Sequence, residues 1–158
     1  MARIRAIQHQ VGDGYLRPMR DSSIRRWSRV HRRLFRMTQG RLGKRLVDND
    51  MLLLTTSGRV TGEAHTVPLL YLRDGDRLVV IASYGGRDHY PDWYLNLESR
   101  REVVVELPGT RVRMVARTAD SNERARWWPR IVDAYHAYAE YQLRTQREIP
   151  VVFLDPRP

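Results

Sequence analysis

The stretch from Thr55 to Gly62 has residue types that suit an anion. It reads Thr-Thr-Ser-Gly-Arg-Val-Thr-Gly, so hydroxyl side chains follow an apolar run and two glycines enclose Arg59. Exposed backbone N–H groups and a guanidinium bind phosphate or carboxylate well. An ordinary hairpin loop needs the same glycines, because turns use glycine for positive φ. The spacing alone favours the hairpin loop and leaves the anion site as the alternative.

A second stretch, residues 82–97, joins the end of a strand to a helix that begins near Pro91. Its Gly85-Gly86 pair permits close approach of the backbone to a ligand, and the N-terminal amides of the helix can hold an anion. Trp93 and Tyr94 have the size and planarity to form the wall of a pocket for a planar ring. Packing in the core is the more common use of such aromatic residues.

Three tyrosines, Tyr135, Tyr138 and Tyr141, recur at every third residue. On a helix they cover an arc of about 120°, and their hydroxyls suit the lining of a substrate cavity. A half-buried aromatic stripe explains the same pattern. Taken alone, the tyrosines favour that stripe.

Metal-dependent and hydrolytic chemistry have no support in the sequence. The five histidines are not spaced as metal ligands, and no Ser/His/Asp set or carboxylate pair has a credible context. The absence of cysteine excludes disulfides, thiolate metal sites and a cysteine nucleophile. We therefore predict no metal site.

Short β-branched and alternating runs predict a mainly β fold with helices, of the α+β class. Strands are expected over 51–56, 63–72, 77–83, 102–107, 111–117 and 149–154. Helices are expected over 91–98, with proline in the first turn, and from Asp120 to 141–144, where Glu123 completes a capping box. One face of the long helix is expected to carry Trp128, Ile131, Val132, Tyr135 and Tyr138. Antiparallel strands with few helices favour a small barrel over an alternating β-α-β sheet.

Positive charge is concentrated near the N-terminus. The 158-residue chain has a formal net charge of +10, yet residues 1–50 hold 13 basic and 4 acidic residues, and residues 51–158 hold 15 and 14. A basic amphipathic helix is predicted over residues 22–37. We therefore divide the chain into a basic leader with this helix, 1–46, and a second domain, 47–158.

The remaining composition bears on location. Residues 1–21 are expected to be a polar segment without regular structure, because glycine and proline interrupt it. No apolar run approaches the roughly 20 residues of a membrane span, and no signal-peptide pattern is present. A cytoplasmic location is therefore expected.

In chain order, these motifs resemble one family, the deazaflavin (coenzyme F420)-dependent nitroreductases and quinone reductases of actinobacteria. The resemblance covers about residues 24–156. The matching motifs are Arg41-Leu42-Gly43, Leu52-Leu53-Leu54-Thr55-Thr56, Gly58-Arg59, Thr61-Gly62, Pro68-Leu69, Asp74-Gly75, Ala82-Ser83, Gly85-Gly86, Pro91-x-Trp93-Tyr94-x-Asn96-Leu97, the three tyrosines, Tyr141-Gln142, Arg144-Thr145, Arg147 and Ile149-Pro150-Val151. Each motif is weak alone, and the ordered set is specific.

The resemblance implies a split β-barrel, similar to the FMN-binding split barrels, that binds coenzyme F420. Hydride would pass from the reduced deazaflavin to a quinone, a nitro-aromatic or another activated acceptor. The implied cofactor-binding residues are Thr56, Ser57, Gly58, Arg59, Val60, Thr61, Gly62, His65, Pro68, Ala82, Ser83, Tyr84, Gly85, Gly86, Trp93, Tyr94 and Asn96. The implied catalytic residue is Tyr138, with Tyr135 and Tyr141 on the substrate side, because a phenol of pKa about 10 stays protonated at neutral pH and can donate to an acceptor oxygen.

Three positions depart from the family pattern, in which basic residues are usual. Here they are Val60, His65 and Tyr84. Each lost charge-assisted contact is worth roughly 1.5–3 kcal/mol. Arg59, Arg87 and the basic leader are candidates to compensate for them. Without such compensation, the alternatives are a short-tailed cofactor, a different flavin or no cofactor.

Two other functions remain open from the sequence. The first is an FMN-binding split-barrel oxidoreductase. The second is a non-catalytic module that binds anionic lipid through its basic helix. The partners expected are a small-molecule electron acceptor, an anionic membrane surface at the inner face of the cell membrane, and a second copy of the chain that covers open sheet edges. No nucleic acid is expected.

Overall fold

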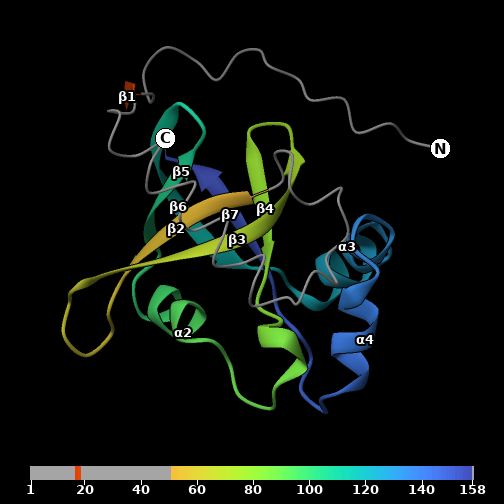
Figure 1. The fold of residues 1–158 in the computed structure, drawn as a ribbon. Coiled ribbons are helices and arrows are strands. Elements are labelled where there is room, and N and C mark those ends of the chain that lie inside the picture. Colours follow the sequence, from red (N-terminus) through yellow and green to blue (C-terminus); the bar gives the residue numbers. More distant parts are fainter. Residues whose placement is uncertain (1–16, 19–50, 158) are drawn as a thin grey trace.

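The computed structural model describes residues 17–18 and 51–157, which form an antiparallel sheet closed into a barrel and accompanied by short helices (Figure 1). The sheet order is β1-β6-β5-β2-β3-β4-β7, and an additional β6–β7 pairing closes strands β2 to β7 on themselves. The elements are β1 (Arg17–Pro18), β2 (Met51–Ser57), β3 (Ala64–Asp74), β4 (Arg77–Ile81), η2 (Tyr84–Gly86), α2 (Asp92–Ser99), β5 (Glu102–Leu107), β6 (Thr110–Thr118), α3 (Ser121–Ala134), α4 (Ala137–Leu143) and β7 (Val151–Pro156). The barrel expected from the strand pattern is confirmed.

Alternation along the strands divides the buried residues into two clusters. On β7, Val152 and Leu154 belong to the cluster inside the barrel. Their neighbours Val151 and Phe153 belong to a second cluster, which includes residues of α3 and α4 such as Trp127. Successive strand residues point to opposite faces, so β7 carries both cores at once. The outer cluster fixes α3 and α4 against one side of the barrel (Figure 1).

Helix α2 lies at one end of the barrel and contributes to the inner cluster. Trp93, Tyr94 and Leu97 are buried there among the strand residues. Pro91 is the N-cap of α2, with extended backbone, and so precedes the first turn in which we expected it. Because proline has no N–H to donate, it begins the helix without loss in either position.

The long C-terminal helix was predicted as one element, and that prediction is wrong. Helix α3 ends at Ala134, Tyr135 has non-helical backbone (φ −144°, ψ 90°), and α4 begins at Ala137. No glycine or proline lies at the break, so tertiary packing overrides local propensity there. After the break, Tyr138 packs in the same outer cluster as Ile131.

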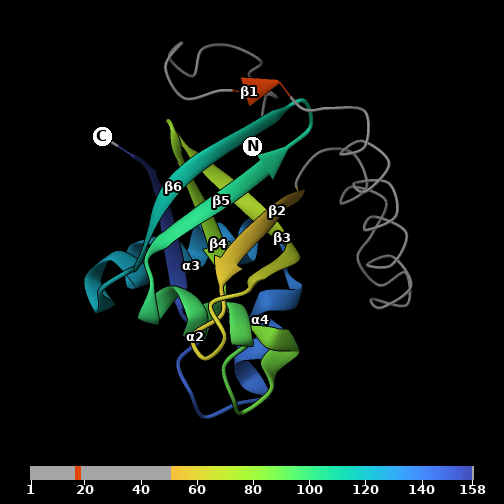
Figure 2. The ribbon, with the colours of Figure 1, turned by 90° about the vertical axis from the view of Figure 1, so that its left-hand side faces the viewer.

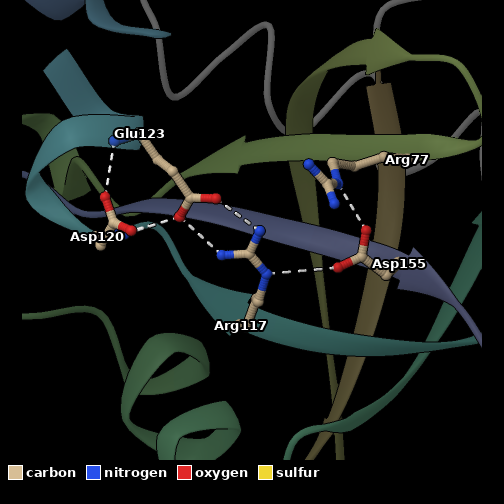
Figure 3. A network of polar contacts seen from close by, with 5 residues as sticks. All are labelled: Arg77, Arg117, Asp120, Glu123 and Asp155. Carbon is tan, nitrogen blue, oxygen red and sulfur yellow. Dashed lines mark hydrogen bonds and ion pairs between the residues drawn. The ribbon is translucent and has the colours of Figure 1, made fainter. Parts of the chain in front are cut away.

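The start of α3 is fastened to the barrel by the network of charged residues in Figure 3. The predicted capping box is confirmed: Glu123 N–H donates to Asp120 Oδ1 (2.8 Å) and Asp120 N–H donates to Glu123 Oε2 (3.0 Å). Arg117 on β6 donates to both Glu123 oxygens, at 2.7 and 2.8 Å. Arg77 donates to Asp155 at 2.6 Å, and Arg117 lies 3.7 Å from the same carboxylate. This network joins α3 to β4, β6 and β7.

Several smaller expectations differ from the structure. Strand β4 ends at Ile81 rather than at 83, and β7 begins at Val151 rather than at 149. On α3 the buried residues are Trp127 and Ile131, whereas Trp128 is half-buried. The strand ends differ from the expectation by two residues, which is within the usual spread of assigned ends, and Pro150 has no backbone N–H to donate to a strand ladder.

The structure describes only residues 17–18 of the N-terminal region for which the sequence made predictions. Arg17–Pro18 forms a two-residue strand that pairs with β6, so regular structure occurs within the segment 1–21. The predicted helix over 22–37 and the 1–46 leader otherwise lie outside the described residues. Within the described ranges, no helix combines the length and apolarity needed to cross a membrane.

Candidate functional site

The loop between β2 and β3 is a closed turn with an exposed tip. Gly58 N–H donates to Glu63 O (2.7 Å) and Gly62 N–H donates to Gly58 O (2.8 Å). Gly62 has a positive φ of 73°, and Val60 at the tip is 88% exposed. A Cβ at Gly58 would lie 2.9 Å from His65 Nε2, so His65 packs against the loop across the hairpin. The hairpin and the positive φ of Gly62 follow the simpler sequence expectation, whereas Gly58 does not have a positive φ.

Asn96 anchors this loop to α2. Its side chain is buried, with 3% of the residue exposed. Its Oδ1 accepts from the Arg59 N–H (3.1 Å) and from Arg59 Nη1 (3.3 Å), and its Nδ2 donates to Thr56 Oγ1 (3.2 Å). One amide therefore satisfies donors and acceptors of both the loop and β2. These hydrogen bonds of Asn96 are all made to groups of the protein itself.

Arg59 also has an acidic partner. Its Nη1 donates to Asp92 Oδ1 at 3.0 Å, with 38% of the Arg59 side chain and 83% of the Asp92 side chain exposed. An exposed pair of this kind is worth about 0–1 kcal/mol. The Arg59 charge is therefore held on α2 weakly enough for another anion to compete for it.

Residues 84–86 form a left-handed turn after β4. Tyr84 (φ 48°), Gly85 (φ 67°) and Gly86 (φ 79°) all have positive φ, which is unusual for tyrosine. Gly86 is buried, and a Cβ there would collide with the carbonyl oxygen of Tyr141. At Gly85 a Cβ would meet nothing within 4 Å. One glycine thus permits contact with α4, and the other leaves the backbone open.

Tyr84 has an exposed aromatic ring at a position where the resemblance leads us to expect a basic residue. The ring is flanked by the Arg87 guanidinium carbon, 4.8 Å from its centroid, and by His89, whose ring centroid lies 5.2 Å away edge-on. Tyr84 is 42% exposed. Arg87 therefore brings a positive charge next to the position where the sequence lacks one.

The three tyrosines form a row of edge-on ring contacts even though the helix breaks between them. The ring centroids of Tyr135 and Tyr138, and of Tyr138 and Tyr141, are 6.0 Å apart at 84°. Tyr138 is 6% exposed, and burial raises the pKa of its hydroxyl above the ordinary value of 10. Tyr135 and Tyr141 are half-buried. The hydroxyl of Tyr138 keeps its proton over the whole physiological range.

Trp93 and Tyr94 lie inside the end of the barrel. They are 7% and 8% exposed and pack edge-on at 6.2 Å. The Tyr94 hydroxyl lies 3.2 Å from Thr118 Oγ1, and burial raises the pKa of Tyr94. Both residues therefore pack in the inner cluster at the end of the barrel where α2 lies. Core packing, the alternative named from the sequence, describes both residues, and their part in the cofactor pocket stays a prediction.

These segments meet at one end of the barrel. Figure 2 shows α2, the β2–β3 connection and α4 at that end, and Gly86 contacts α4 directly. Ser83 and Ala82 are buried at the start of the turn. Pro68 lies farther along β3, paired with Leu53, and is half-buried. Thr56, Ser57 and Thr61 belong to the loop side, where Ser57 Oγ donates to Gly62 O at 3.1 Å.

Comparison with known proteins decides the family. The family model described as F420H(2)-dependent quinone reductase matches residues 27–156. The chain belongs to the F420H(2)-dependent quinone reductase family. An F420H(2)-dependent quinone reductase of Mycobacterium tuberculosis is 38% identical over 134 residues, which are 82% of this chain and 89% of the relative.

Solved structures agree with the family. An F420-H2 dependent reductase (FDR-A) is 34% identical, with a TM-score of 0.61 over 67% of this chain and 94% of that one. A solved domain-swapped dimer is 32% identical, with a TM-score of 0.63 over 84% of this chain and 99% of that one. The split-barrel fold, the oxidoreductase class and the F420 cofactor expected from the resemblance are confirmed. The family thus favours F420 over FMN and an enzyme over a lipid-binding module.

A cavity on the surface of the barrel adjoins the β2–β3 loop. This cavity of about 240 Å³ lies beside β2, β5 and β6 and is lined by Thr55–Ser57 and Gly62, together with Arg113 and Arg157. It includes none of residues 83–86 and none of the three tyrosines. It therefore adjoins the loop side of the site alone.

Sequence reasoning missed two residues as structural supports of residues 82–87. Arg147 contacts the turn through its guanidinium, and Gln142 holds the backbone of Arg147 by donating from Nε2 to its carbonyl at 2.9 Å. Both were seen only as members of a motif. Their partners lie on distant segments or are backbone groups, so no local pattern reveals them.

Proposed function

We propose that this chain binds reduced F420 at the end of the barrel formed by the β2–β3 loop, residues 83–86 and α4, and passes its hydride to a quinone. Family membership supports the reaction. The observation that carries the site is the convergence of the anchored loop, the left-handed glycine turn and the tyrosine row at one end (Figure 2).

The residues present fit a large anionic group. The positions that a Cβ would occupy at Gly62 and Gly85 are open for at least 4 Å, so a ligand can approach the backbone there. Arg59 and Arg87 supply positive charge on the two sides, one next to the loop and one next to the turn. We assign the loop, with His65, to the phosphate and acidic tail of the cofactor, and Ser83 to Gly86 to its arm and ring.

Charge compensation is part of this assignment. Val60, His65 and Tyr84 occupy positions that are usually basic. Arg59 would exchange its exposed partner Asp92 for an anionic group of the cofactor, and Arg87 lies beside Tyr84. Such exposed charges hold an anion in a way that salt weakens.

We assign the three tyrosines to the side of the site that binds the electron acceptor. Reduced F420 supplies a hydride when it is bound. Tyr138 is assigned as hydrogen-bond donor to the acceptor oxygen, because burial keeps its hydroxyl protonated. Tyr135 and Tyr141 hold the Tyr138 ring edge-on from both sides. A nitro-aromatic has the same kind of acceptor oxygen and stays a predicted alternative substrate.

Two measurements test the assignment. Fluorescence titration of the full chain should show F420 binding that is at least about tenfold tighter than FMN binding. Tight FMN binding with no F420 binding would contradict the proposal.

The variant Tyr138→Phe should lower kcat for quinone reduction by at least about tenfold, with little change in F420 affinity. The cause is loss of a donor without loss of the ring. Steady-state kinetics with a soluble quinone measure kcat, and Tyr71→Phe, on β3 and outside the tyrosine row, serves as the matched control. Unchanged turnover of every acceptor in Tyr138→Phe would remove this role.

We propose in addition that the chain meets an anionic membrane surface from the cytoplasmic side. The support is the charge of residues 1–50, with 13 basic and 4 acidic residues, and the membrane location of an apolar quinone. Flotation with vesicles of anionic lipid should recover the chain, and vesicles of neutral lipid should not. Replacement of Arg25, Arg26 and Arg29 by Gln should reduce recovery, and equal recovery would reject the proposal.

We propose finally that the chain forms a homodimer. The domain-swapped dimer among its structural relatives supports this state. Strands β2 to β7 close on themselves, so the open sheet edges expected from the sequence are absent among these strands and are not an argument for the dimer. Light scattering on the purified chain should give twice the mass of one chain of 18.7 kDa. A mass equal to one chain at all concentrations would contradict it.

A further inference from the structure

Arg147 spans the left-handed turn from its start to its end. Its Nη2 donates to Ser83 O (2.8 Å) and to Ala82 O (3.2 Å), Nη1 also donates to Ala82 O (3.2 Å), and Nε donates to Arg87 O (2.8 Å). Its guanidinium carbon lies 4.9 Å from the Tyr90 ring centroid. One side chain thus ties together three carbonyls that flank residues 84–86.

These contacts fix which way the peptide groups of the turn face. No peptide bond of the described residues is cis, and in a trans peptide the N–H points opposite to the C=O. Since the carbonyls of Ala82 and Ser83 point to Arg147, the N–H groups of Ser83 and Tyr84 point away from it. Arg147 therefore directs two donors to the other side of the turn.

The backbone of Arg147 is itself held by α3 and α4. Gln142 Nε2 donates to the Arg147 carbonyl (2.9 Å), and Gln142 Oε1 accepts from Arg124 Nη2 and from Ile149 N–H, both at 2.9 Å. Arg124 Nε donates to Ile149 O at 2.9 Å. The support runs from α3 through Gln142 to Arg147, and from there to the turn.

We propose that Arg147 is a positioning residue of the cofactor site: its guanidinium holds residues 82–87 so that the Ser83 and Tyr84 N–H groups face the ligand. The inference rests on the proposed function for the identity of that ligand. The hydrogen bonds between Arg147 and the turn do not depend on the identity of that ligand. A guanidinium serves this role because its fixed fork reaches several acceptors at once. A lysine offers one point of charge and cannot bridge the three carbonyls.

The first test follows the turn without any cofactor. Amide hydrogen exchange of residues 82–87 is measured in the full chain, in Arg147→Lys and in Arg147→Ala. We expect exchange in this segment to speed up at least about tenfold in both variants, with the β2–β3 loop unchanged. Arg130→Ala is the matched control, because Arg130 also lies over an aromatic ring, 4.1 Å from Trp127, but does not touch the turn. Unchanged exchange at 82–87 in Arg147→Lys would overturn the inference.

The second test uses the ligand and a chemical rescue. Arg147→Lys should bind F420 roughly tenfold more weakly, in line with the loss of charge-assisted hydrogen bonds. Guanidinium ion at a non-denaturing concentration should restore part of both the affinity and the protection in Arg147→Ala. If Arg147→Ala does not fold, Arg147→Lys alone decides the result. Failure of the unaltered chain to bind F420 would reject the proposed function, and the exchange test would still judge the positioning role. Equal F420 affinity in the chain and in Arg147→Lys would overturn that role.

Discussion

The β2–β3 loop and the 83–86 turn lie at the same end of the barrel and are held in opposite ways. The loop is exposed at residues 59–62 and is attached through one buried amide, Asn96. The turn has its buried Gly86 against the backbone of α4 and is bridged by Arg147. The loop can therefore adjust to a ligand at low cost, whereas the turn is already set.

This difference assigns distinct tasks to the two regions. A flexible acidic tail needs charge that can follow it, and the exposed pair of Arg59 and Asp92 offers such charge. A hydride donor needs a fixed distance to its acceptor, since small displacements are costly in rate. The turn and the tyrosine row provide that fixed frame.

The largest expected difference between the turn and the loop appears when a methyl group is added at one glycine in each region. Gly86→Ala should lower the free energy of unfolding by about 3 kcal/mol or more, because positive φ and a collision with Tyr141 add together. Gly62→Ala should lower it by only about 1 kcal/mol, because its Cβ meets open space. Urea denaturation measures both. Similar losses at the two glycines would show that the turn is no more constrained than the loop.

Removal of the amide anchor tests the loop itself. Asn96→Leu should lower the free energy of unfolding by about 2 kcal/mol, because the Arg59 N–H and Thr56 hydroxyl lose a buried partner. Exchange should rise in the loop and stay unchanged in the turn. Hydrogen exchange with mass spectrometry separates the two segments, and a rise confined to 82–87 would contradict the assignment of Asn96 to the loop.

Acid should weaken the attachment of α3 to the barrel. Hydrogen bonds from Arg117 and the capping N–H lower the pKa of Glu123 from 4.5 to about 2. A lowered pKa means that Glu123 stabilises the fold fully above about pH 4.5 and loses this contribution as pH falls toward 2. Glu123→Gln should lower the free energy of unfolding at pH 7 by about 1–2 kcal/mol.

The control for this prediction is the pH profile. Between pH 4.5 and 2, stability should fall less steeply in Glu123→Gln than in the unaltered chain. Parallel profiles from urea denaturation at several pH values would exclude Glu123 as a source of the acid dependence.

The smallest expected effect concerns the exposed charge pair. Asp92→Asn should release Arg59 and tighten F420 binding by about two- to fivefold at low salt, because a surface pair is worth under about 1 kcal/mol. Titrations at two salt concentrations measure it, and the gain should shrink at high salt. Weaker binding in Asp92→Asn would mean that Asp92 orients Arg59 instead of competing with the ligand.

Local patterns in the sequence were enough for the barrel and the capped helix. Val112, Met114 and Ala116 alternate with the outward residues Arg111, Arg113, Val115 and Arg117, three of which are charged, and belong to the inner cluster. Asp120 with Glu123 marks the start of α3. Such signals depend on neighbours within a few residues, which is why they can be read directly.

The missing parts depend on distant contacts. The break at Tyr135 has no glycine or proline to announce it, and it follows from the packing of Tyr138 in the outer cluster. Arg147 acts on carbonyls that lie 60 to 65 residues away along the chain. A carbonyl is present at every residue, so the sequence carries no mark of which one is used.

The most direct test of the central claim is quinone reduction by the full chain with two electron donors. Reduced F420 and reduced FMN are supplied at equal concentration with a soluble quinone, and the rate of donor oxidation is followed. We predict saturable, enzyme-dependent turnover with reduced F420 and at least about tenfold slower turnover with reduced FMN. Equal or faster turnover with reduced FMN, or none with reduced F420, would contradict the account.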